Sequence, residues 1–594
     1  MIQEYLHTLP GSLGDLEFPR AGDRAVWDGL PQGVRAALIR RGEEYLGWRW
    51  PVMTCGDYLT FSRTGDRTRY EEKCHPRQQA LCALALAECA EHQGRFLDDL
   101  IDGIWFVCEE SGWQLPAHNT YIRDTPTLPL PDTARPIPDL FACESAANLS
   151  LIRALLGEEL EQAAPGLCRR ILREVDARVV APYLREHFWW MGDGDEPVNN
   201  WTSWCTQNVL LSVFTAGYGQ DVKRRVAEQA AYSLDCFLDG YGQDGCCEEG
   251  AEYYHHAGIT LWGALEVLDR VSGGHFAPLF QEEKLRNIAM YIVNVHVDGD
   301  CYLNYADCLP LAGPRGAGEY LFGCRVQAPG LCAMAAADVS RRVTRDLPGS
   351  KSLFERLLDA LCAQALAAPA VPVPPEEEVF YPSTGLWIAR DETWCVSLRA
   401  GHNGLSHGHC DAGSLIVYRK GQPLLIDVGV ETYTAKTFSP ERYSIWTMRS
   451  DWHNLPTIGG RVQGSGRDCA PAGVKRFREG DASVIELELA PAYPGGGFSY
   501  TRRAVLARGG GGLTVTDRYQ GEEGAVLSLL FAQRPVWRDG ALETPAGSIC
   551  LGGAREPMVE AVPIRDPHLR KCWPDTLYRA LVPVDGTLEM KFLP

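Results

Sequence analysis

The chain has 594 residues, of which 45% are hydrophobic and 23% are charged. These fractions are ordinary for a folded protein, and they exclude a disordered, collagen-like or coiled-coil chain. Lysine and arginine number 57 against 77 aspartate and glutamate residues, which gives a formal charge of −20. So acidic a chain is a poor candidate for general binding of nucleic acid or of an anionic membrane, although a local basic pocket can still bind an anionic substrate.

The cysteines and the N-terminus indicate a cytoplasmic protein. The 21 cysteines form no Cys-x-x-Cys pair, and the adjacent Cys246 and Cys247 are poor disulfide partners. Free thiols in a reducing compartment fit this pattern better than a disulfide framework. The first residues lack the basic start and apolar run of a signal peptide, and the best apolar run, which begins at Leu81, is broken by Glu88. We therefore expect no transmembrane helix.

Apolar residues at three- and four-residue spacing recur through the first 366 residues. This spacing is typical of helices that bury one face. It predicts helices near residues 33–46, 77–93, 96–109, 144–157, 167–184, 205–217, 221–238, 258–271, 283–296, 331–343 and 352–367. So many helices with almost no alternating strands indicate an all-α domain over residues 1–366, an α/α toroid or incomplete barrel.

A proline-rich segment then separates this domain from one of a different period. Within residues 367–383, four prolines between positions 369 and 375 are followed by three glutamates, which is typical of an extended linker. Beyond it, alternating apolar residues predict strands within residues 385–391, 393–401, 413–427, 482–490, 502–517 and 525–533. Gly509 to Gly512 are expected to form a hairpin turn. The predicted fold is therefore α+β and multidomain, an α/α toroid followed by an antiparallel β-sandwich over residues 384–594.

Four of the 14 histidines lie close together in the second domain: His402, His407, His409 and His453. If His407 and His409 lie on a strand, their side chains share one face. Asp427 ends the next strand of the apparent hairpin. Two or three imidazoles with one carboxylate are a common ligand set for Zn²⁺. The cluster predicts a metal or functional site, with ordinary surface or core histidines as the alternative, and its spacing does not select zinc.

Polar and aromatic residues open the helix predicted near 258–271. Tyr253, Tyr254, His255 and His256 are consecutive, so on a helix their side chains point about 100° apart. Only one or two of them can face a common pocket. The alternative is a helix N-terminus whose acidic residues suit the helix dipole and whose aromatic residues serve packing.

Asparagine and tryptophan residues open another predicted helix. Asn199 and Asn200 precede Trp201 and Trp204, which are three apart and share a face. Asparagine at a helix start is usually a cap. The functional alternative is an amide that binds a substrate oxygen, with these tryptophans and the Trp189–Trp190 pair as platforms for sugar rings.

Taken together, these segments resemble the heparinase II/III-like polysaccharide lyases, which include alginate and oligo-alginate lyases. The resemblance covers most of the chain, and the segments that carry it are residues 62–88, WQLPAHN (113–119), DLFACESAANL (139–149), NNW (199–201), EGAEYYHHAG (249–258), 406–433 and WHNLPTIGG (452–460). It implies an α/α toroid followed by an antiparallel β-sandwich, with the active site in the cleft between them. It also implies a lyase that cuts uronic-acid glycans by β-elimination.

The resemblance further assigns roles to individual residues. Asn200 would neutralise the substrate carboxylate, Tyr253 would be the catalytic tyrosine and His407 the catalytic histidine. Two departures leave alternatives open: Trp201 follows Asn200 where many members carry histidine, and His256 stands where many carry tyrosine. Tyr254 and His256 therefore remain candidates for the catalytic acid or base, with Arg449 as a further partner of the carboxylate. The residues expected to bind the substrate are Trp201, Trp204, Trp189, Trp190, Glu249 and His402.

The resemblance implies that His409, Asp427 and His453 hold a structural zinc ion. Asp411 is a candidate for a supporting contact to a ligand.

The expected substrate is an anionic oligosaccharide that is imported into the cytoplasm and cut from one end. Nucleic acid and membranes are not expected partners. The sequence does not select an oligomeric state, and a homodimer is one candidate.

Two other functions compete with a lyase. The first alternative is a glycoside hydrolase, which needs two carboxylates about 5–10 Å apart. Its candidates are Glu249 and Glu252 with Asp193 or Asp195. The second alternative is a glycan-binding protein without catalysis.

Overall fold

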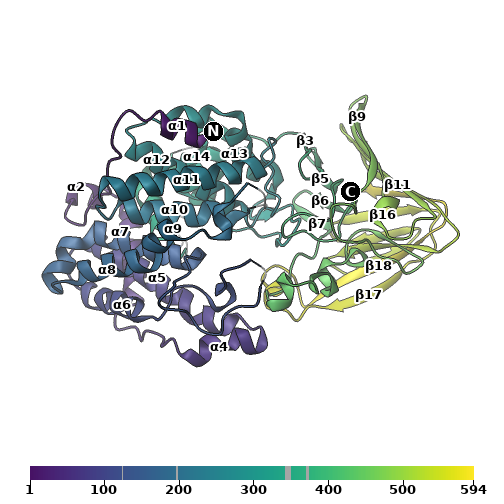
Figure 1. Ribbon diagram of the computed structural model, residues 1–594. Coiled ribbons are helices and arrows are strands. Elements are labelled where there is room, and N and C mark those ends of the chain that lie inside the picture. The colour runs from purple at the N-terminus through teal and green to yellow at the C-terminus, as the bar shows by residue number, and fades with distance from the viewer. Residues whose placement is uncertain (124, 195–197, 342–349, 369–372, 594) are drawn as a thin grey trace. The chain divides into compact units, whose positions relative to one another are not determined.

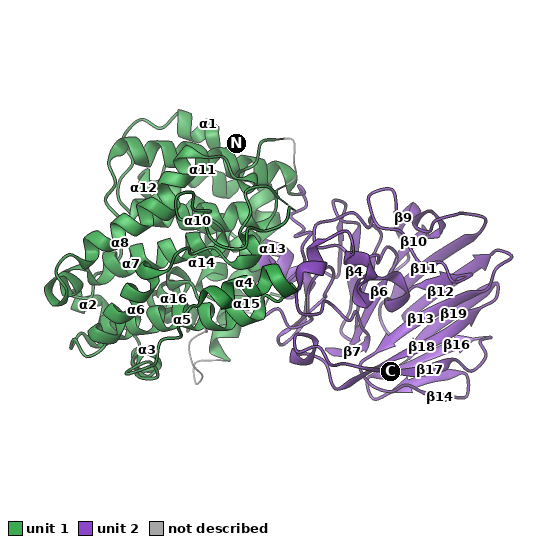
Figure 2. Ribbon diagram, turned by 60° about the horizontal axis from the view of Figure 1, so that its bottom comes forward, with its two compact units in different colours: residues 1–241, 255–289, 314–373 green, residues 242–254, 290–313, 374–594 purple. Residues whose placement is uncertain are grey.

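The computed structural model describes all of the chain except residues 124, 195–197, 342–349, 369–372 and 594. The chain divides into two compact units (Figure 2). Unit 1 comprises residues 1–241, 255–289 and 314–373, and unit 2 comprises residues 242–254, 290–313 and 374–594. Two segments that precede the predicted linker, 242–254 and 290–313, therefore belong to unit 2.

The N-terminal part of the chain is helical, as its periodicity predicts (Figure 1). Its α-helices are α1 (Ile2–His7), α2 (Arg24–Trp27), α3 (Gln32–Glu43), α4 (Cys55–Thr64), α5 (Thr68–Glu91), α6 (Leu97–Glu109), α7 (Leu140–Ala163), α8 (Leu167–Val175), α9 (Ala181–Arg185), α10 (Asn200–Phe214), α11 (Gln220–Gly240), α12 (Thr260–Val271), α13 (Glu283–Val295), α14 (Ala317–Arg325), α15 (Pro329–Ser340), α16 (Leu353–Leu361) and α17 (Ala363–Leu366). Short 3₁₀ or π turns are η1 (Pro116–His118), η2 (Asp176–Val180), η3 (Trp189–Met191), η4 (His255–Ile259) and η5 (Ala277–Gln281).

Caps explain why two helices begin earlier than their apolar stripes. The Asp139 side chain accepts a hydrogen bond from the backbone N–H of Ala142 at 2.7 Å and starts α7. The Asn199 side chain accepts one from Trp201 at 3.1 Å and starts α10. Such caps satisfy N–H groups that the first helical turn leaves free, so the helix begins at the cap and not at the first apolar residue. The last residues of the helix predicted at 331–343 lie outside the described part of the chain.

Helix α7 is apolar and long enough to cross a membrane, with a mean hydropathy of 1.2 over its most apolar window. Within the protein, however, 78% of that window is buried. The central helix of a helical domain has the same length and composition, and α7 packs against α5, α8 and α10 in unit 1.

The C-terminal part of the chain is built of antiparallel strands, again as predicted. They are β3 (Glu378–Tyr381), β4 (Leu386–Arg390), β5 (Trp394–Arg399), β6 (Leu415–Arg419), β7 (Gln422–Leu425), β8 (Pro456–Ile458), β9 (Ala472–Glu479), β10 (Ala482–Glu488), β11 (Ser499–Ala507), β12 (Gly512–Gln520), β13 (Ala525–Phe531), β14 (Val536–Arg538), β15 (Ala541–Thr544), β16 (Gly547–Gly552), β17 (Met558–Pro563), β18 (Thr576–Val584) and β19 (Thr587–Leu593). Earlier in the chain, β1 (His296–Asp298) pairs with β2 (Cys301–Tyr302).

Three sheets form the sandwich of unit 2. Their strand orders are β14-β15-β16-β19-β12-β11-β10-β9, β17-β18-β13-β8 and β3-β4-β5-β6-β7. Strand β11 alternates between half-buried and buried residues along its whole length, which places one face on the core. All three sheets contribute to this core, for example through Trp387, Val417, Leu527 and Met590.

The predicted glycine hairpin turn is present. The glycine run after Arg508 connects β11 to β12, and Gly509 and Gly510 have φ of 67° and 95°, values that favour glycine.

Part of the segment predicted as a linker is a strand. Residues 378–381, inside that segment, pair with β4 as strand β3. Pro369 and Pro372 of that segment lie outside the described residues.

Candidate functional site

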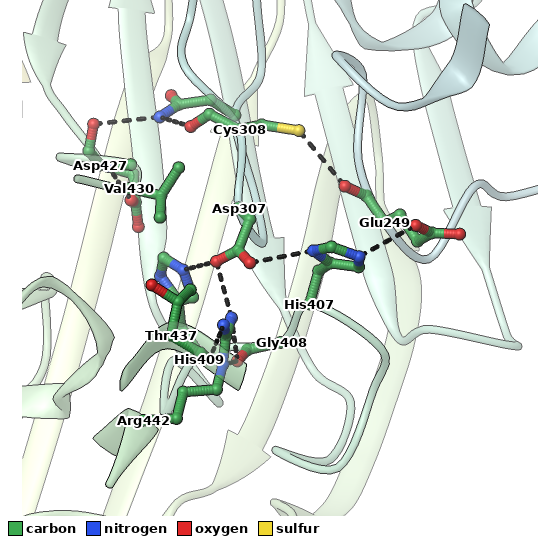
Figure 3. A network of polar contacts seen from close by, with 12 residues as sticks. Glu249, Asp307, Cys308, His407, Gly408, His409, Asp427, Val430, Thr437 and Arg442 are labelled. Carbon is green, nitrogen blue, oxygen red and sulfur yellow. Dashed lines mark hydrogen bonds and ion pairs between the residues drawn. The ribbon is translucent and has the colours of Figure 1, made fainter. Parts of the chain in front are cut away.

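A buried carboxylate, Asp307, is the centre of a polar network in unit 2 (Figure 3). Its Oδ2 atom lies 2.9 Å from Nδ1 of His407, and its Oδ1 atom lies 3.0 Å from Nε2 of His409. The guanidinium of Arg442 donates to Oδ1 at 2.6 Å. One aspartate in the irregular segment after β2 therefore holds two of the predicted histidines.

Electrostatics keep this carboxylate ionised. Burial alone would raise the pKa of Asp307, but the hydrogen bonds with His407 and His409 and the charge of Arg442 outweigh it and hold the pKa well below its usual range. Because Asp307 stays anionic, it stabilises positive charge on the groups around it.

His407 lies in a loop and not on a strand, which corrects the expectation from its spacing. Residues 401–414 are irregular, and His407 has φ of 54° in the left-handed region. Its Nδ1 atom faces Asp307, and its Nε2 atom lies 3.2 Å from Oε2 of Glu249. Burial would lower the pKa of His407, but the Asp307 hydrogen bond and the Glu249 charge raise it. The two carboxylates thus favour an imidazolium.

Two tyrosine hydroxyls meet beside this histidine. The hydroxyl oxygens of Tyr253 and Tyr433 are 2.6 Å apart, and the rings of Tyr253 and His407 lie 4.6 Å apart. Tyr433 also donates to Asp307 at 3.0 Å and lies 3.2 Å from Nδ1 of His407. Burial and the nearby Asp307 charge raise the pKa of Tyr253 well above its usual value. Tyr253 is therefore a neutral phenol that can donate a proton.

His409, Asp427 and His453 form a group that could hold a metal ion. Each is buried and offers one ligand atom, and these atoms lie within 4.8 Å of one another. The hairpin predicted from the sequence is present: β6 and β7 pair, and Asp427 follows β7 by two residues. Nδ1 of His453 lies 2.7 Å from Oδ2 of Asp427.

The chemistry of this group fits a metal such as zinc. Two imidazoles and one carboxylate are a common zinc set. Nε2 of His453 is buried and has no hydrogen-bond partner among the described residues. The contact of His409 with Asp307 is the kind of carboxylate–histidine support that orients metal ligands. Asp411, a candidate for such support, pairs with Arg399 at 3.2 Å.

Asn200 and the tryptophans predicted to bind substrate all lie in unit 1. Asn200 is the first residue of α10 and is buried, and Asn199 provides the cap. Trp201 lies 5.1 Å from Trp189 and 4.6 Å from the ring of His118, measured between ring centroids. Both tryptophans are half-buried.

Trp190 differs from its neighbours. It is 1% exposed and packs between Tyr183 and Phe188, a core position of unit 1.

The adjacent histidines His255 and His256 of unit 1 differ in charge: the first is positively charged and the second is neutral. His255 lies 3.0 Å from Glu319 and 3.1 Å from Glu355. Burial would lower the pKa of His255, but these two carboxylates raise it well above its usual value. Burial and the His255 charge lower the pKa of His256 to about 3. His256 is thus neutral, and it stacks on Trp204 with ring centroids 4.0 Å apart.

The charge of His255 predicts a pH-dependent stability. Its contribution is complete below the unfolded pKa of about 6.5 and is lost as pH rises through the raised folded value. We expect His255→Gln to lower the free energy of unfolding by about 1–3 kcal/mol at pH 6 because Glu319 and Glu355 lose their partner. The difference should shrink as the pH is raised, measured by urea denaturation. His92→Gln, which removes a more exposed pair with Glu159, is the matched control; an equal loss in both variants would contradict the prediction.

The other predicted residues, Tyr254, His402 and Arg449, make contacts with residues outside the Asp307 network. Tyr254 is fully buried with its ring 6.0 Å from that of Tyr291. His402 accepts a hydrogen bond from the backbone N–H of Gly404 on its ring at 3.1 Å. Arg449 is partly exposed and pairs with Asp451 at 2.9 Å. Arg442, seven residues earlier, is the arginine that contacts Asp307.

The carboxylates considered for a hydrolase are also placed by the structure, except Asp195, which lies outside the described residues. Glu249 pairs with His407, and Glu252 accepts the backbone N–H of Leu309 at 3.2 Å. Burial raises the pKa of Glu252. Asp193 lies in unit 1.

Three residues of the network were not predicted: Asp307, Tyr433 and Arg442. Tyr433 ends the quoted segment 406–433, so its place beside His407 had a weak signal in the sequence. Asp307 had none, since it lies 100 positions from His407 along the chain.

Comparison with known proteins agrees with this architecture. Residues 373–536 match the family model described as heparinase II/III-like, C-terminal. Among solved structures, heparinase III superposes with a TM-score of 0.64 at 12% identity and covers 100% of this chain and 88% of its own. A mutant of the heparan sulfate lyase HepC from Pedobacter heparinus gives 0.59 at 14% identity, covering 94% of this chain and 82% of that one. No curated protein sequence matches.

These matches confirm the resemblance that the motifs indicated. At such identities the structural likeness shows the fold, a helical toroid followed by an antiparallel β-sandwich.

Proposed function

We propose that the protein is a polysaccharide lyase that cleaves uronic-acid glycans by β-elimination. The observation that supports this most is the cluster of Tyr253, Tyr433, His407 and Asp307, with hydroxyl and imidazole groups within hydrogen-bond reach of one another. A second support is the fold, which this chain shares with proteins named heparinase III and heparan sulfate lyase.

β-Elimination from a uronate needs groups of these kinds. The C5 proton lies next to a carboxylate and is very weakly acidic. Cleavage requires positive charge or hydrogen-bond donors at that carboxylate, a base for the C5 proton and an acid for the departing O4 oxygen. Donors that are fixed before the reaction stabilise the developing enolate-like oxygens without reorganisation.

His407 and Tyr253 suit two of these roles. The imidazolium of His407 can bind the substrate carboxylate through Nε2, in exchange for its contact with Glu249. Tyr253, a neutral phenol, can protonate O4. It can take the C5 proton only as a phenolate, after its own proton has been lost to solvent; the Tyr433 hydroxyl, 2.6 Å away, can then donate a hydrogen bond to that phenolate. Asn200 remains the proposed amide donor and His256 the proposed alternative base.

The experiment that tests this function is a screen of uronate glycans: alginate, heparan sulfate, chondroitin, hyaluronan and glucuronan oligosaccharides. A lyase leaves a C4–C5 double bond conjugated to the carboxylate, so the product absorbs ultraviolet light. Saturated reducing ends without this absorbance would indicate a hydrolase. Binding without any product would indicate a glycan-binding protein.

We further propose that the enzyme acts in the cytoplasm from one end of imported oligosaccharides. A long anionic polymer does not cross a membrane, and the chain carries free thiols in the part that the structure describes. A defined tetrasaccharide should therefore give unsaturated mono- or disaccharides from the first time point. The parent polymer should lose viscosity slowly. Rapid loss of viscosity with products of many sizes would contradict this prediction.

We propose that His409, Asp427 and His453 bind one structural Zn²⁺. When bound, zinc would join three chain segments and, through the Asp307 contacts with His409 and His407, help to fix the position of His407.

Metal binding predicts a gain in stability. A ligand present at 100 times its dissociation constant stabilises a protein by about 2.7 kcal/mol. We expect Zn²⁺ to raise the melting temperature of the chelator-treated chain and to bind at one ion per chain by elemental analysis. His453→Ala should abolish both effects, whereas His402→Ala should not. An unchanged melting temperature with no bound metal would contradict the prediction.

A further inference from the structure

The core of the β-sandwich contains a buried ion pair that nothing in the proposed chemistry uses. Arg502 on β11 and Asp517 on β12 are direct partners across the strand pair. They form two parallel hydrogen bonds, Nε to Oδ1 at 2.8 Å and Nη2 to Oδ2 at 2.7 Å, and both side chains are 0% exposed. Tyr500 donates to the same carboxylate at 2.7 Å. Since a buried ion pair adds little net stability compared with apolar side chains, its presence calls for another reason.

The third nitrogen of Arg502 reaches two loops that carry predicted metal ligands. Nη1 donates to the carbonyl of Gly413 at 2.8 Å and to the carbonyl of Asn454 at 2.7 Å. Asn454 directly follows His453, and Gly413 lies four residues after His409. One guanidinium therefore holds the backbone next to His453 and the loop that carries His409.

Asn454 extends this connection to the third ligand. Its side-chain amide donates to the carbonyls of Leu415 and Ile426 at 2.7 and 2.9 Å, and its Oδ1 accepts the N–H of Leu530 at 2.8 Å. Ile426 directly precedes Asp427. The three ligand segments are thus connected to β11 and β13 through fully buried hydrogen bonds.

We infer that Arg502 is a positioning residue for the His409–Asp427–His453 metal site. This inference rests on the proposed metal binding. Metal affinity depends on ligands held close to their productive geometry, and loss of supporting contacts typically costs 10–100-fold in affinity. The side chain of Arg502 fixes the backbone from which two ligands project, and Asp517 and Tyr500 fix the guanidinium.

The test must separate positioning from general support of the fold. The triple variant Tyr500→Phe, Arg502→Met, Asp517→Leu replaces the charged cluster with apolar side chains of similar size, a change that is often neutral for stability. Arg502→Lys keeps the charge and loses the planar fork. The matched control is Arg503→Met, on the next residue of β11, which removes an exposed pair with Glu479.

The measurement uses the full chain, freed of metal by a chelator and titrated with Zn²⁺ or Co²⁺. We expect the dissociation constant, measured by competition with a chromophoric chelator, to rise 10–100-fold in the triple variant and in Arg502→Lys. The visible absorption of bound Co²⁺ should change in both, and Arg503→Met should match wild type. Wild-type affinity and an unchanged cobalt spectrum in Arg502→Lys would overturn the inference while leaving the metal proposal intact. A wild-type chain that binds no metal would overturn both.

A pair of thiols in unit 1 carries a second and independent inference. Cys324 lies near the end of α14 and Cys332 in the first turn of α15, with sulfur atoms 3.7 Å apart. Cys324 is exposed and Cys332 is half-buried. A disulfide has sulfurs about 2.0 Å apart, so the two atoms need to approach by less than 2 Å.

We propose that Cys324 and Cys332 form a reversible disulfide by exchange with a small-molecule disulfide. The Cys324 thiolate attacks the small disulfide and releases one thiolate; the Cys332 thiolate then attacks the Cys324 sulfur and releases the second. The two protons pass to the two released thiolates, so the protein thiols are oxidised and the small disulfide is reduced. Exposure makes Cys324 the first to react, because burial raises the pKa of Cys332 to about 12.

The full chain should be equilibrated in reduced and oxidised glutathione, alkylated and mapped by peptide mass spectrometry. We expect a peptide pair joined through Cys324 and Cys332 that is lost in Cys324→Ser and kept in Cys469→Ser. In Cys332→Ser, glutathione should remain attached to Cys324. Persistent glutathione on Cys324 of the wild-type chain, or no oxidation at either cysteine, would overturn the proposal.

Discussion

Replacing Tyr253 with phenylalanine is expected to lower kcat by about 10²–10⁴-fold, the usual contribution of a positioned acid or base. The substitution removes one hydroxyl, which lies 2.6 Å from the hydroxyl of Tyr433, and leaves the ring that packs beside His407. Because a neutral phenol is the proton donor in the proposed reaction, its loss should affect kcat more than KM. The measurement is the initial rate of ultraviolet absorbance on the best substrate of the glycan screen.

The matched control for this change is Tyr305→Phe. Tyr305 is also a buried tyrosine of unit 2, but its hydroxyl bonds Ser397 at 2.9 Å and does not reach the Asp307 network. It should keep near wild-type activity, and both variants should unfold at similar denaturant concentrations. If Tyr253→Phe keeps its rate while Tyr254→Phe loses it, the catalytic tyrosine is Tyr254.

Much of the fold was predictable because each part of the chain has a clear hydrophobic period. Strands β11 and β12 alternate between buried and more exposed residues in the sandwich as their sequences predict, whereas β4 and β5 are buried along their whole length, and the helices repeat every three to four residues. Helix starts were less predictable, since side-chain caps such as Asp139 and Asn199 set them. Segments 242–254 and 290–313 carry no signal that they join unit 2, because packing between distant segments leaves no local pattern.

The candidate site was predictable where residues are close in the chain. The histidine cluster indicated a metal or functional site, and the family resemblance assigned His409, Asp427 and His453 to it; the structure brings their ligand atoms within 4.8 Å of one another. Irregular backbone, by contrast, has no period. Arg449 was predicted from the sequence as a partner of the site, whereas Arg442 is the arginine that contacts Asp307; the short 3₁₀ turns between them have no period that could distinguish the two. Asp307 could not be found at all, although it contacts both His407 and His409.

Replacing Asp307 with asparagine is expected to have the largest effect on stability in unit 2. Asp307 is fully buried, and its charge balances Arg442 and the imidazolium of His407. Removing one partner of a buried charge pair costs about 3–5 kcal/mol because the other charge stays buried without compensation. An asparagine also presents an amide N–H₂ to groups that need an acceptor. We therefore expect the free energy of unfolding to fall by about this amount, with loss of activity and weaker Zn²⁺ binding.

The pH dependence of this loss tests its electrostatic origin. The pKa of Asp307 is lowered, so its stabilisation is complete above the unfolded value of about 3.9 and is lost as pH falls through the folded value. The pKa of His407 is raised, so its stabilisation is complete below about 6.5 and is lost as pH rises through its folded value. The difference between wild type and Asp307→Asn should therefore be largest between about pH 4 and 6.5 and smaller on either side. Asp451→Asn, which removes the more exposed pair with Arg449, should cost less than about 1 kcal/mol across this range. A loss in Asp307→Asn that is constant with pH, or equal to that of the control, would show that its hydrogen bonds and not its charge hold this site together.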